Sequence, residues 1–197
     1  MSDMDECTIT VETVKGPVKG ICLLSTLGDT FYRFRGVPFA KPPIGDLRFK
    51  DPQPIDAWTD VFDATIPGPS AMGFTGRLNI MNERCSENCL TLNVYTKNLT
   101  PKQLSPVMIW IHGGGFKYGN TAEELFGPDY LLQKNIVFVS INYRLGALGF
   151  LSIPDPSLNI PGNAGLKDQA MAFRWVRENI HAFGGDNKNI TIFGSSA

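Results

Sequence analysis

Residues 107–116 read VMIWIHGGGF, an unbroken apolar run followed by His112 and three consecutive glycines. Short apolar runs without alternation are typical of strands that are covered on both faces, as in parallel sheets. Two further runs of this kind occur, IVFVSI at 136–141 and ITIF at 190–193. We therefore expect three buried strands of a parallel sheet in the second half of the chain.

A helix is expected between the second and third runs, because apolar residues recur there at spacings of three and four and so share one helix face. They are Leu166, Ala170, Phe173, Val176, Ile180 and Phe183. Asp168 lies in the first turn, where a negative charge is favourable, and Gly184-Gly185 provides a stop. Strand, helix and strand in this order form a crossover unit, so the predicted fold class is α/β.

The first hundred residues predict antiparallel strands and loops. Residues 9–14 and 18–24 are apolar runs on either side of Lys15-Gly16-Pro17, which indicates strand, turn and strand. Residues 31–35 and 90–95 alternate between apolar and polar positions and indicate two more strands.

Prolines and glycines interrupt the remainder of this first part. Pro38, Pro42 and Pro43 lie within six residues, which predicts an extended surface loop. No periodicity persists from 58 to 89. We see no internal repeat or domain boundary, so residues 1–197 are expected to form a single domain.

Composition argues against several classes of protein. The 197 residues carry 18 Lys and Arg against 19 Asp and Glu, and this balance argues against a nucleic-acid-binding protein. No run approaches the roughly 18 apolar residues of a membrane helix, and the acidic amino terminus does not resemble a secretory signal. The four cysteines match neither a zinc pattern nor a dense disulfide scaffold, which favours free thiols in a reducing compartment.

Two glycine-containing turns come directly after two of the expected strands. The run 112–115 leaves backbone N–H groups unobstructed, although such a run could equally be a plain turn. The run 194–197, Gly-Ser-Ser-Ala, matches the first part of a Gly-x-Ser-x-Gly elbow, a tight strand-to-helix turn that exposes its serine. In an α/β-hydrolase, N–H groups from an HGGG loop and from the residue after that serine hold the oxyanion of the tetrahedral intermediate. We therefore expect Ser196 to be the nucleophile, with oxyanion donors at Gly114, Gly115 and Ala197.

The sequence strongly resembles the type-B carboxylesterases, a family that includes cholinesterases and insect esterases. The resemblance extends from about Gly16 to Ala197 and rests on motifs in order: FRGVPFAKPPIGDLRF (34–49), SENCLTLNVY (86–95), PVMIWIHGGGF (106–116), NYRLGALGFL (142–151), GNAGLKDQAMAFRWVRENIHAFGGD (162–186) and NITIFGSSA (189–197). It implies an α/β-hydrolase fold, in which antiparallel strands lead into a mostly parallel sheet, and ester hydrolysis through an acyl-serine. It implies Ser196 as the nucleophile and Gly114, Gly115 and Ala197 as the oxyanion-hole residues, as the two turns also indicate. It further implies a structural ion pair between Arg48 and Glu87, and no metal or cofactor.

The chain departs from the family at its carboxyl end. In this fold the acid and the histidine of the triad come after the serine, and only Ala197 comes after Ser196. The chain has two histidines: we expect His112 to be structural and His181 to lie at a helix surface or end. The resemblance thus implies an amino-terminal fragment, a single partial carboxylesterase type-B domain at 1–197, which is expected to fold poorly and to be inactive alone.

Three further departures bear on substrate and location. Ser195 stands where the family commonly has glutamate, and no aromatic residue lies between Arg77 and Glu87, which removes a cation–π platform. The substrate is therefore expected to be an uncharged small-molecule ester, with no nucleic-acid or membrane partner. Ser70-Ala71 stand where secreted relatives have the partner of the cysteine at Cys89, so the chain is more similar to intracellular insect esterases and is expected in the cytoplasm.

Two other functions compete with ester hydrolysis. A non-catalytic, cholinesterase-like adhesion domain would share the fold, but such relatives often lack the serine that is present at Ser196. A nucleotide-binding domain would need a G-x-G-x-x-G turn that opens a helix, and residues 112–120, HGGGFKYGN, do not have that spacing.

Overall fold

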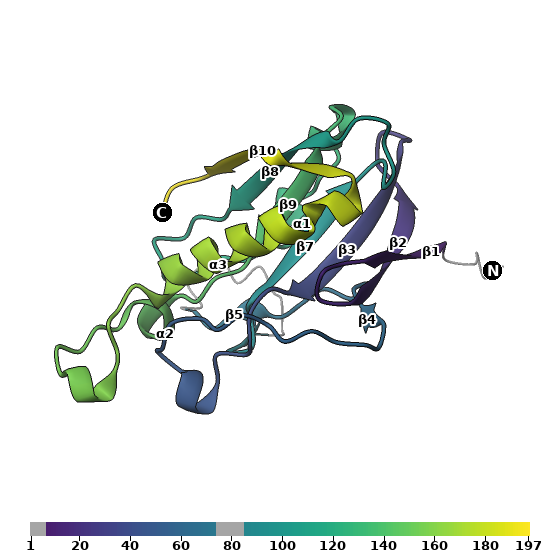
Figure 1. Ribbon diagram of the computed structural model, residues 1–197. Coiled ribbons are helices and arrows are strands. Elements are labelled where there is room, and N and C mark those ends of the chain that lie inside the picture. Colours follow the sequence, from purple (N-terminus) through teal and green to yellow (C-terminus); the bar gives the residue numbers. More distant parts are fainter. Residues whose placement is uncertain (1–6, 74–84) are drawn as a thin grey trace, which may run out of the picture.

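Seven strands succeed one another across a single mixed sheet in the order β1-β2-β3-β7-β9-β8-β10, and an eighth, β4, pairs with β2 (Figure 1). The computed structural model describes residues 7–73 and 85–197. The strands of this sheet are β1 (Thr8–Glu12), β2 (Pro17–Leu24), β3 (Thr30–Pro38), β4 (Phe62–Asp63), β7 (Thr91–Thr96), β8 (Ser105–Ile111), β9 (Val137–Ile141) and β10 (Gly185–Gly194). Two short strands, β5 (Ser70–Ala71) and β6 (Cys85–Ser86), pair separately.

Along the order β1-β2-β3-β7-β9-β8-β10 the pairing changes once, from antiparallel to parallel. The pairs from β1 through β2, β3 and β7 to β9 are antiparallel, whereas β8 runs parallel to both β9 and β10. This arrangement confirms the predicted α/β class, in which antiparallel strands lead into a parallel part. The three apolar runs of the sequence are the three parallel strands.

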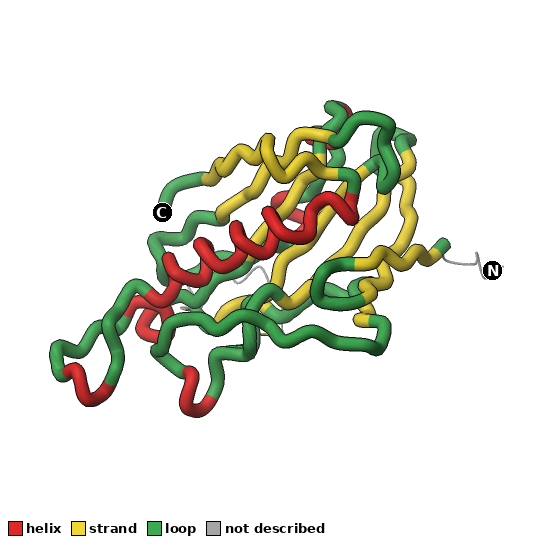
Figure 2. The backbone as a smooth tube through the Cα atoms, in the orientation of Figure 1, coloured by secondary structure: helices red, strands yellow, loops and turns green. Residues whose placement is uncertain are grey.

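One long helix covers a face of the sheet (Figure 2). This helix, α3 (Ala164–Asn179), continues into a 3-10 turn at Ile180–Phe183 and returns the chain to β10. The remaining helices are short: α1 (Glu123–Phe126) and α2 (Gly146–Phe150), with 3-10 turns at Gly45–Leu47, Leu131–Gln133 and Pro156–Leu158. No helix in residues 7–73 or 85–197 is long and apolar enough to cross a membrane.

The buried face of α3 differs from the predicted one. Val176 is fully buried as expected, but Leu166 is 45% exposed and Ala170 is exposed. The buried stripe instead includes Asp168 and Gln169. The prediction was wrong because it used apolar residues alone, whereas a polar residue with a buried partner can occupy a core-facing position.

The proline-rich segment is only partly the surface loop that its composition predicts: residues 41–44 have no regular secondary structure and Ile44 is 52% exposed, but the residues before them are buried. Strand β3 continues through Pro38, which pairs with Thr91 of β7, and the next two residues, Phe39 and Ala40, remain buried. Proline is compatible with the sheet here because the pairing of β2 with β3 ends at Arg33, so no β2 residue lies opposite Pro38 on that side of the strand.

Strand β10 is more exposed than its sequence predicts. It pairs with β8 along one edge, and no strand in the described ranges pairs with its other edge. Ile192 is consequently 49% exposed. The prediction of burial on both faces therefore does not hold for β10, whereas every residue of β9 is buried.

Candidate active site

Ser196 lies on a tight turn directly after β10. Its φ is 59°, in the left-handed region that residues other than glycine rarely adopt. A side chain at the preceding Gly194 would place its Cβ 2.6 Å from the carbonyl oxygen of Ile111 in β8, so the close approach of the two strands requires glycine. The turn therefore has the strained, exposed geometry that a nucleophile elbow needs.

The glycine loop after β8 lies against this turn. Because β8 and β10 are parallel neighbours, with Gly194 opposite Ile111, their carboxyl ends place the two turns side by side. A Cβ at Gly113 would lie 3.0 Å from the Cβ of Ser196, and the Gly115 N–H donates a hydrogen bond to the Ala197 carbonyl. The structure thus brings the predicted nucleophile and the glycine loop together.

The glycines of this loop adopt conformations that exclude most other residues. Gly114 has a φ of 133° and Gly115 a φ of 59°. The Gly114 carbonyl accepts N–H groups from Lys117 and Tyr118, at 3.0 and 3.3 Å, and these bonds close the loop into a compact turn. The expected oxyanion donors therefore lie on a fixed backbone.

His112 supports the loop from beneath. Its ring stacks on Tyr143 with centroids 4.6 Å apart, and the Tyr143 hydroxyl donates to the His112 carbonyl at 2.9 Å. Its Nδ1 lies 3.0 Å from the Gly113 carbonyl oxygen, which assigns the ring proton to Nδ1. Burial lowers the pKa of His112, so the ring is neutral at pH 7. This is the structural role expected for His112, and His181 is exposed in the 3-10 turn after α3.

A groove of about 340 Å³ opens beside Ser196. Its walls come from β8, the glycine loop, the start of α3 and the turn after β10. The lining residues are Ile111, His112, Phe116, Tyr143, Leu166, Gln169, Gly194, Ser195, Ser196 and Ala197. The groove provides space for a small, largely apolar molecule next to the serine hydroxyl.

The predicted partners Arg48 and Glu87 form a bidentate ion pair. Arg48 Nε lies 2.5 Å from Glu87 Oε2, and Arg48 Nη2 lies 2.8 Å from Glu87 Oε1. Hydrogen bonding and charge between them raise the pKa of Arg48 and lower that of Glu87. The pair joins two loops that are 39 residues apart in the chain.

A second ion pair, between Arg144 and Asp168, was not predicted from the sequence. Asp168 Oδ1 accepts from Arg144 Nη2 at 2.7 Å, while Oδ2 accepts from Arg144 Nε at 2.8 Å and from its backbone N–H at 3.0 Å. Both side chains are almost completely buried. The sequence did contain a signal for this pair. Asp168 precedes Ala172 by four residues and Val176 by eight, so it lies on the same face of α3 as these two buried residues.

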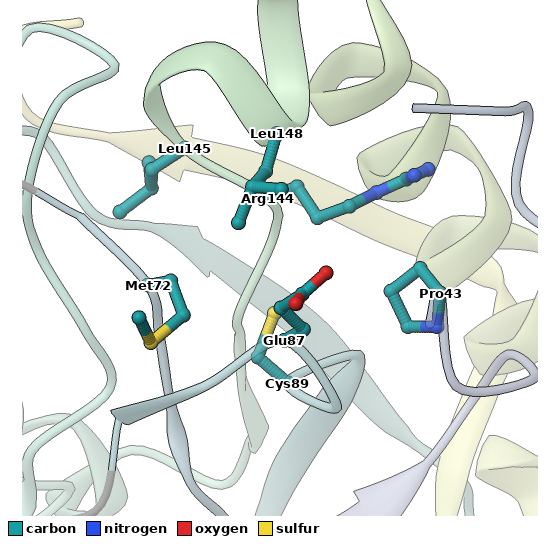
Figure 3. A pocket seen from close by; sticks show the side chains of 7 residues that line it. All are labelled: Pro43, Met72, Glu87, Cys89, Arg144, Leu145 and Leu148. Atoms are coloured by element: carbon teal, nitrogen blue, oxygen red, sulfur yellow. The ribbon is translucent and has the colours of Figure 1, made fainter. Parts of the chain in front are cut away.

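Figure 3 shows a small pocket around Cys89 that is lined by one member of each ion pair, Glu87 and Arg144. It is lined by Pro43, Met72, Glu87, Cys89, Arg144, Leu145 and Leu148, and these side chains leave no room for a water molecule. Burial raises the pKa of Cys89 to about 12, and the negative charge of Asp168 contributes to this rise. This thiol is therefore protonated and inaccessible in the folded protein.

We expect iodoacetamide at pH 8 to modify Cys7 in the folded protein and to leave Cys89 unmodified until the protein is unfolded. Cys7 is exposed, whereas Cys89 is 1% exposed, and alkylation requires an accessible thiolate. Peptide mapping before and after addition of urea measures both rates. Equal rates at the two cysteines in the folded protein would contradict this expectation.

Comparison with known proteins gives one consistent result. The model of the carboxylesterase family matches residues 7–197. The chain is 48% identical to Esterase B1 of Culex pipiens, and the match covers 96% of this chain and 35% of that protein. It is 46% identical to the juvenile hormone esterase of Tribolium castaneum, and that match covers 95% of this chain and 32% of that protein. The crystal structure of juvenile hormone esterase from Manduca sexta, with OTFP covalently attached, matches with a TM-score of 0.90 and 38% identity, over 96% of this chain and 36% of that one. The chain thus spans about a third of the length of these relatives.

Proposed function

The chain belongs to the carboxylesterase family, and we propose on this basis that the whole protein hydrolyses carboxylic esters through an acyl-enzyme formed on Ser196. The observation that supports the proposal most directly is the left-handed Ser196, exposed above a glycine loop that touches it. Labelling the full-length protein with an organophosphate and mapping the modified peptide tests it. A label on any other serine would refute the assignment.

In the proposed mechanism, Ser196 Oγ attacks the carbonyl carbon of the ester and forms a tetrahedral intermediate. The N–H groups of Gly114, Gly115 and Ala197 hold the negative oxygen of this intermediate. The alcohol then leaves, and water hydrolyses the acyl-serine.

The general base of this mechanism is proposed to lie outside residues 1–197. His112 is buried beneath the glycine loop and His181 is exposed on the 3-10 turn after α3, so neither is placed to accept the proton of the exposed Ser196. Without a base, Ser196 is a neutral alcohol and a poor nucleophile. We therefore propose that residues 1–197 alone do not hydrolyse p-nitrophenyl acetate, which an assay of that segment against its Ser196→Ala variant tests.

We expect Gly119→Ala in the full-length protein to lower kcat by about 10²-fold, since small displacements of catalytic groups cost rates of this order. Gly119 has a φ of 122°, and an added Cβ would collide with the His112 ring and the Gly113 carbonyl, which displaces the glycine loop. Steady-state kinetics together with the melting temperature measure the effect.

Gly28→Ala is the matched control for this variant. Gly28 also has a positive φ, 87°, but its Cβ would meet no atom within 4 Å, in a turn between β2 and β3. The Gly28→Ala variant therefore has a cost of backbone strain of about 1–2 kcal/mol, but it does not displace the glycine loop at 112–115. Equal kcat values for the two folded variants would contradict the proposed role of the loop.

The proposed substrates are uncharged esters. Ser195 places a neutral side chain next to the nucleophile, and Phe116 and Leu166 give the adjacent groove an apolar wall. The other basis of this expectation, the lack of an aromatic residue between Arg77 and Glu87, rests mainly on residues 77–84, outside the described ranges. A higher kcat/KM for p-nitrophenyl butyrate than for butyrylthiocholine is expected, and the reverse order would refute the proposal.

The proposed location of the protein is the cytoplasm. The support is the sequence around Ser70-Ala71, which offers no cysteine partner for Cys89 at the place expected from secreted relatives, and the packing of Cys89 as a buried thiol. Fractionation of cells, followed by thiol labelling after unfolding without a reductant, tests this. Recovery of Cys89 in a disulfide from a secreted fraction would refute it.

A further inference from the structure

Two cysteines face each other at the amino-terminal end of the sheet. Cys7 immediately precedes β1, and the register pairs Thr8 with Ile21, which places Cys7 directly opposite Cys22 in β2. The Cys22 N–H donates to the Cys7 carbonyl at 2.7 Å and so continues the ladder by one more residue pair. Because β1 and β10 are the two ends of the strand order, this pair is remote from the candidate active site (Figure 1).

The register gives the two cysteines the spacing of a disulfide. Burial raises the pKa of Cys22, and the neighbouring Cys7 contributes to this rise. Opposed residues in a hydrogen-bonded antiparallel pair have Cα atoms about 5.5 Å apart, and disulfides span Cα separations of about 4.4–6.8 Å. A disulfide therefore fits this position with little movement of the backbone.

The surroundings favour reaction at these two cysteines over Cys89. Cys7 is exposed and Cys22 is partly buried, so a dissolved oxidant reaches the first directly, whereas Cys89 is sealed in the core. Within the described ranges, strand β1 has one neighbour in the sheet, β2. The end of such an edge strand is free to adjust on its open side as the bond forms.

We propose that Cys7 and Cys22 are a redox-active dithiol, which a low-molecular-weight disulfide such as glutathione disulfide converts into an intramolecular disulfide that fixes β1 to β2. The Cys7 thiolate attacks one sulfur of glutathione disulfide and releases one glutathione thiolate. The Cys22 thiolate then attacks the Cys7 sulfur of the mixed disulfide and releases the second glutathione. The two protein thiols lose two protons and two electrons, and glutathione disulfide is reduced to two glutathione molecules.

The crosslink has a defined structural effect. It closes a loop that contains the turn at Thr13–Gly16 and most of the β1–β2 hairpin. Opening of the edge strand then requires the opening of both strands together, so amide exchange in β1 slows in the oxidised protein. The second step of the oxidation needs the Cys22 thiolate, so it speeds up as the pH rises above neutrality.

The test is oxidation of the full-length protein in a glutathione buffer, followed by alkylation and trypsin digestion. Trypsin cleaves after Lys15, Lys19 and Arg33, so Cys7 and Cys22 fall on separate peptides, 1–15 and 20–33. The expected product is one linked species whose mass is two hydrogens below the sum of the two peptides. We expect its equilibrium yield relative to the dithiol to be at least about tenfold higher in the folded protein than in urea.

Cysteine variants distinguish the proposed Cys7–Cys22 disulfide from other thiol reactions of the protein. Cys22→Ser is expected to accumulate the mixed disulfide with glutathione on Cys7, because no thiol resolves it, whereas Cys85→Ser leaves the linked peptide unchanged. A stable glutathione adduct on Cys7 in the unmodified protein, with no linked peptide, would overturn the proposal. An equal yield in folded and unfolded protein would do the same, because it would show that the fold contributes nothing.

Discussion

The Ser196→Ala variant of the full-length protein is expected to hydrolyse p-nitrophenyl acetate with a kcat lower by about 10⁴–10⁶-fold. Removal of the hydroxyl removes the atom that forms the acyl-enzyme, and the remaining oxyanion donors supply only a residual rate. Single-turnover and steady-state assays measure the loss, and the melting temperature shows whether the fold is intact.

Ser195→Ala is the matched control for this loss. Ser195 is the neighbouring residue and is also exposed, but its backbone is not in the left-handed region. Its side chain lines the groove but forms no bond to the substrate in the proposed chemistry, so the kcat of Ser195→Ala for this uncharged ester is expected to fall by less than about tenfold. Nearly full activity in a folded Ser196→Ala variant would contradict the assignment of the nucleophile.

Asp168→Asn is expected to lower the free energy of unfolding by about 3–5 kcal/mol. The amide keeps the size of the side chain but removes its charge, and the Arg144 guanidinium then remains buried without a counter-ion. Urea titration of the full-length protein, followed by tryptophan fluorescence, measures the change, with attention to whether the transition stays cooperative.

The adjacent residue supplies the control for this second prediction. Lys167 forms an ion pair with Asp51 at 2.5 Å, yet both side chains are well exposed. Such a pair contributes about 1 kcal/mol or less, so Lys167→Gln is expected to have a small effect. If the two variants lost similar stability, burial would not be the cause of the Arg144–Asp168 contribution.

Much of the fold could be predicted because the apolar runs are long and the glycines are well placed. The predicted ranges of β8 and β9 agree with the structure to within one or two residues, and the predicted helix at 166–183 corresponds to α3 together with the 3-10 turn at Ile180–Phe183. The buried face of α3 could not be predicted, because the burial of Asp168 depends on Arg144, a residue 24 positions away. Asn179, also buried, depends likewise on distant contacts, since its side-chain oxygen accepts the N–H of Val14.

For the candidate site too, the sequence predicts the individual segments but not the contacts between them. The turn at 194–197 and the loop at 112–115 are visible in the sequence because each has an unusual local composition. Their contact is set by the register of β8 against β10, which pairs segments about 80 residues apart. The support that Tyr143 gives to the loop is a further contact of this kind, 31 residues distant, and no local pattern indicates it.

The order of strands also determines what happens while the protein is being synthesised. The sheet partners of β8 in the described part of the chain are β9 and β10, and both come later in the sequence. The ribosome makes about 5–20 residues per second, so at least about 4 s separate the synthesis of Ile111 from that of its partner Gly194. During this interval the apolar residues 107–111 have an unpaired edge, and such an edge is a site of aggregation that a chaperone would protect.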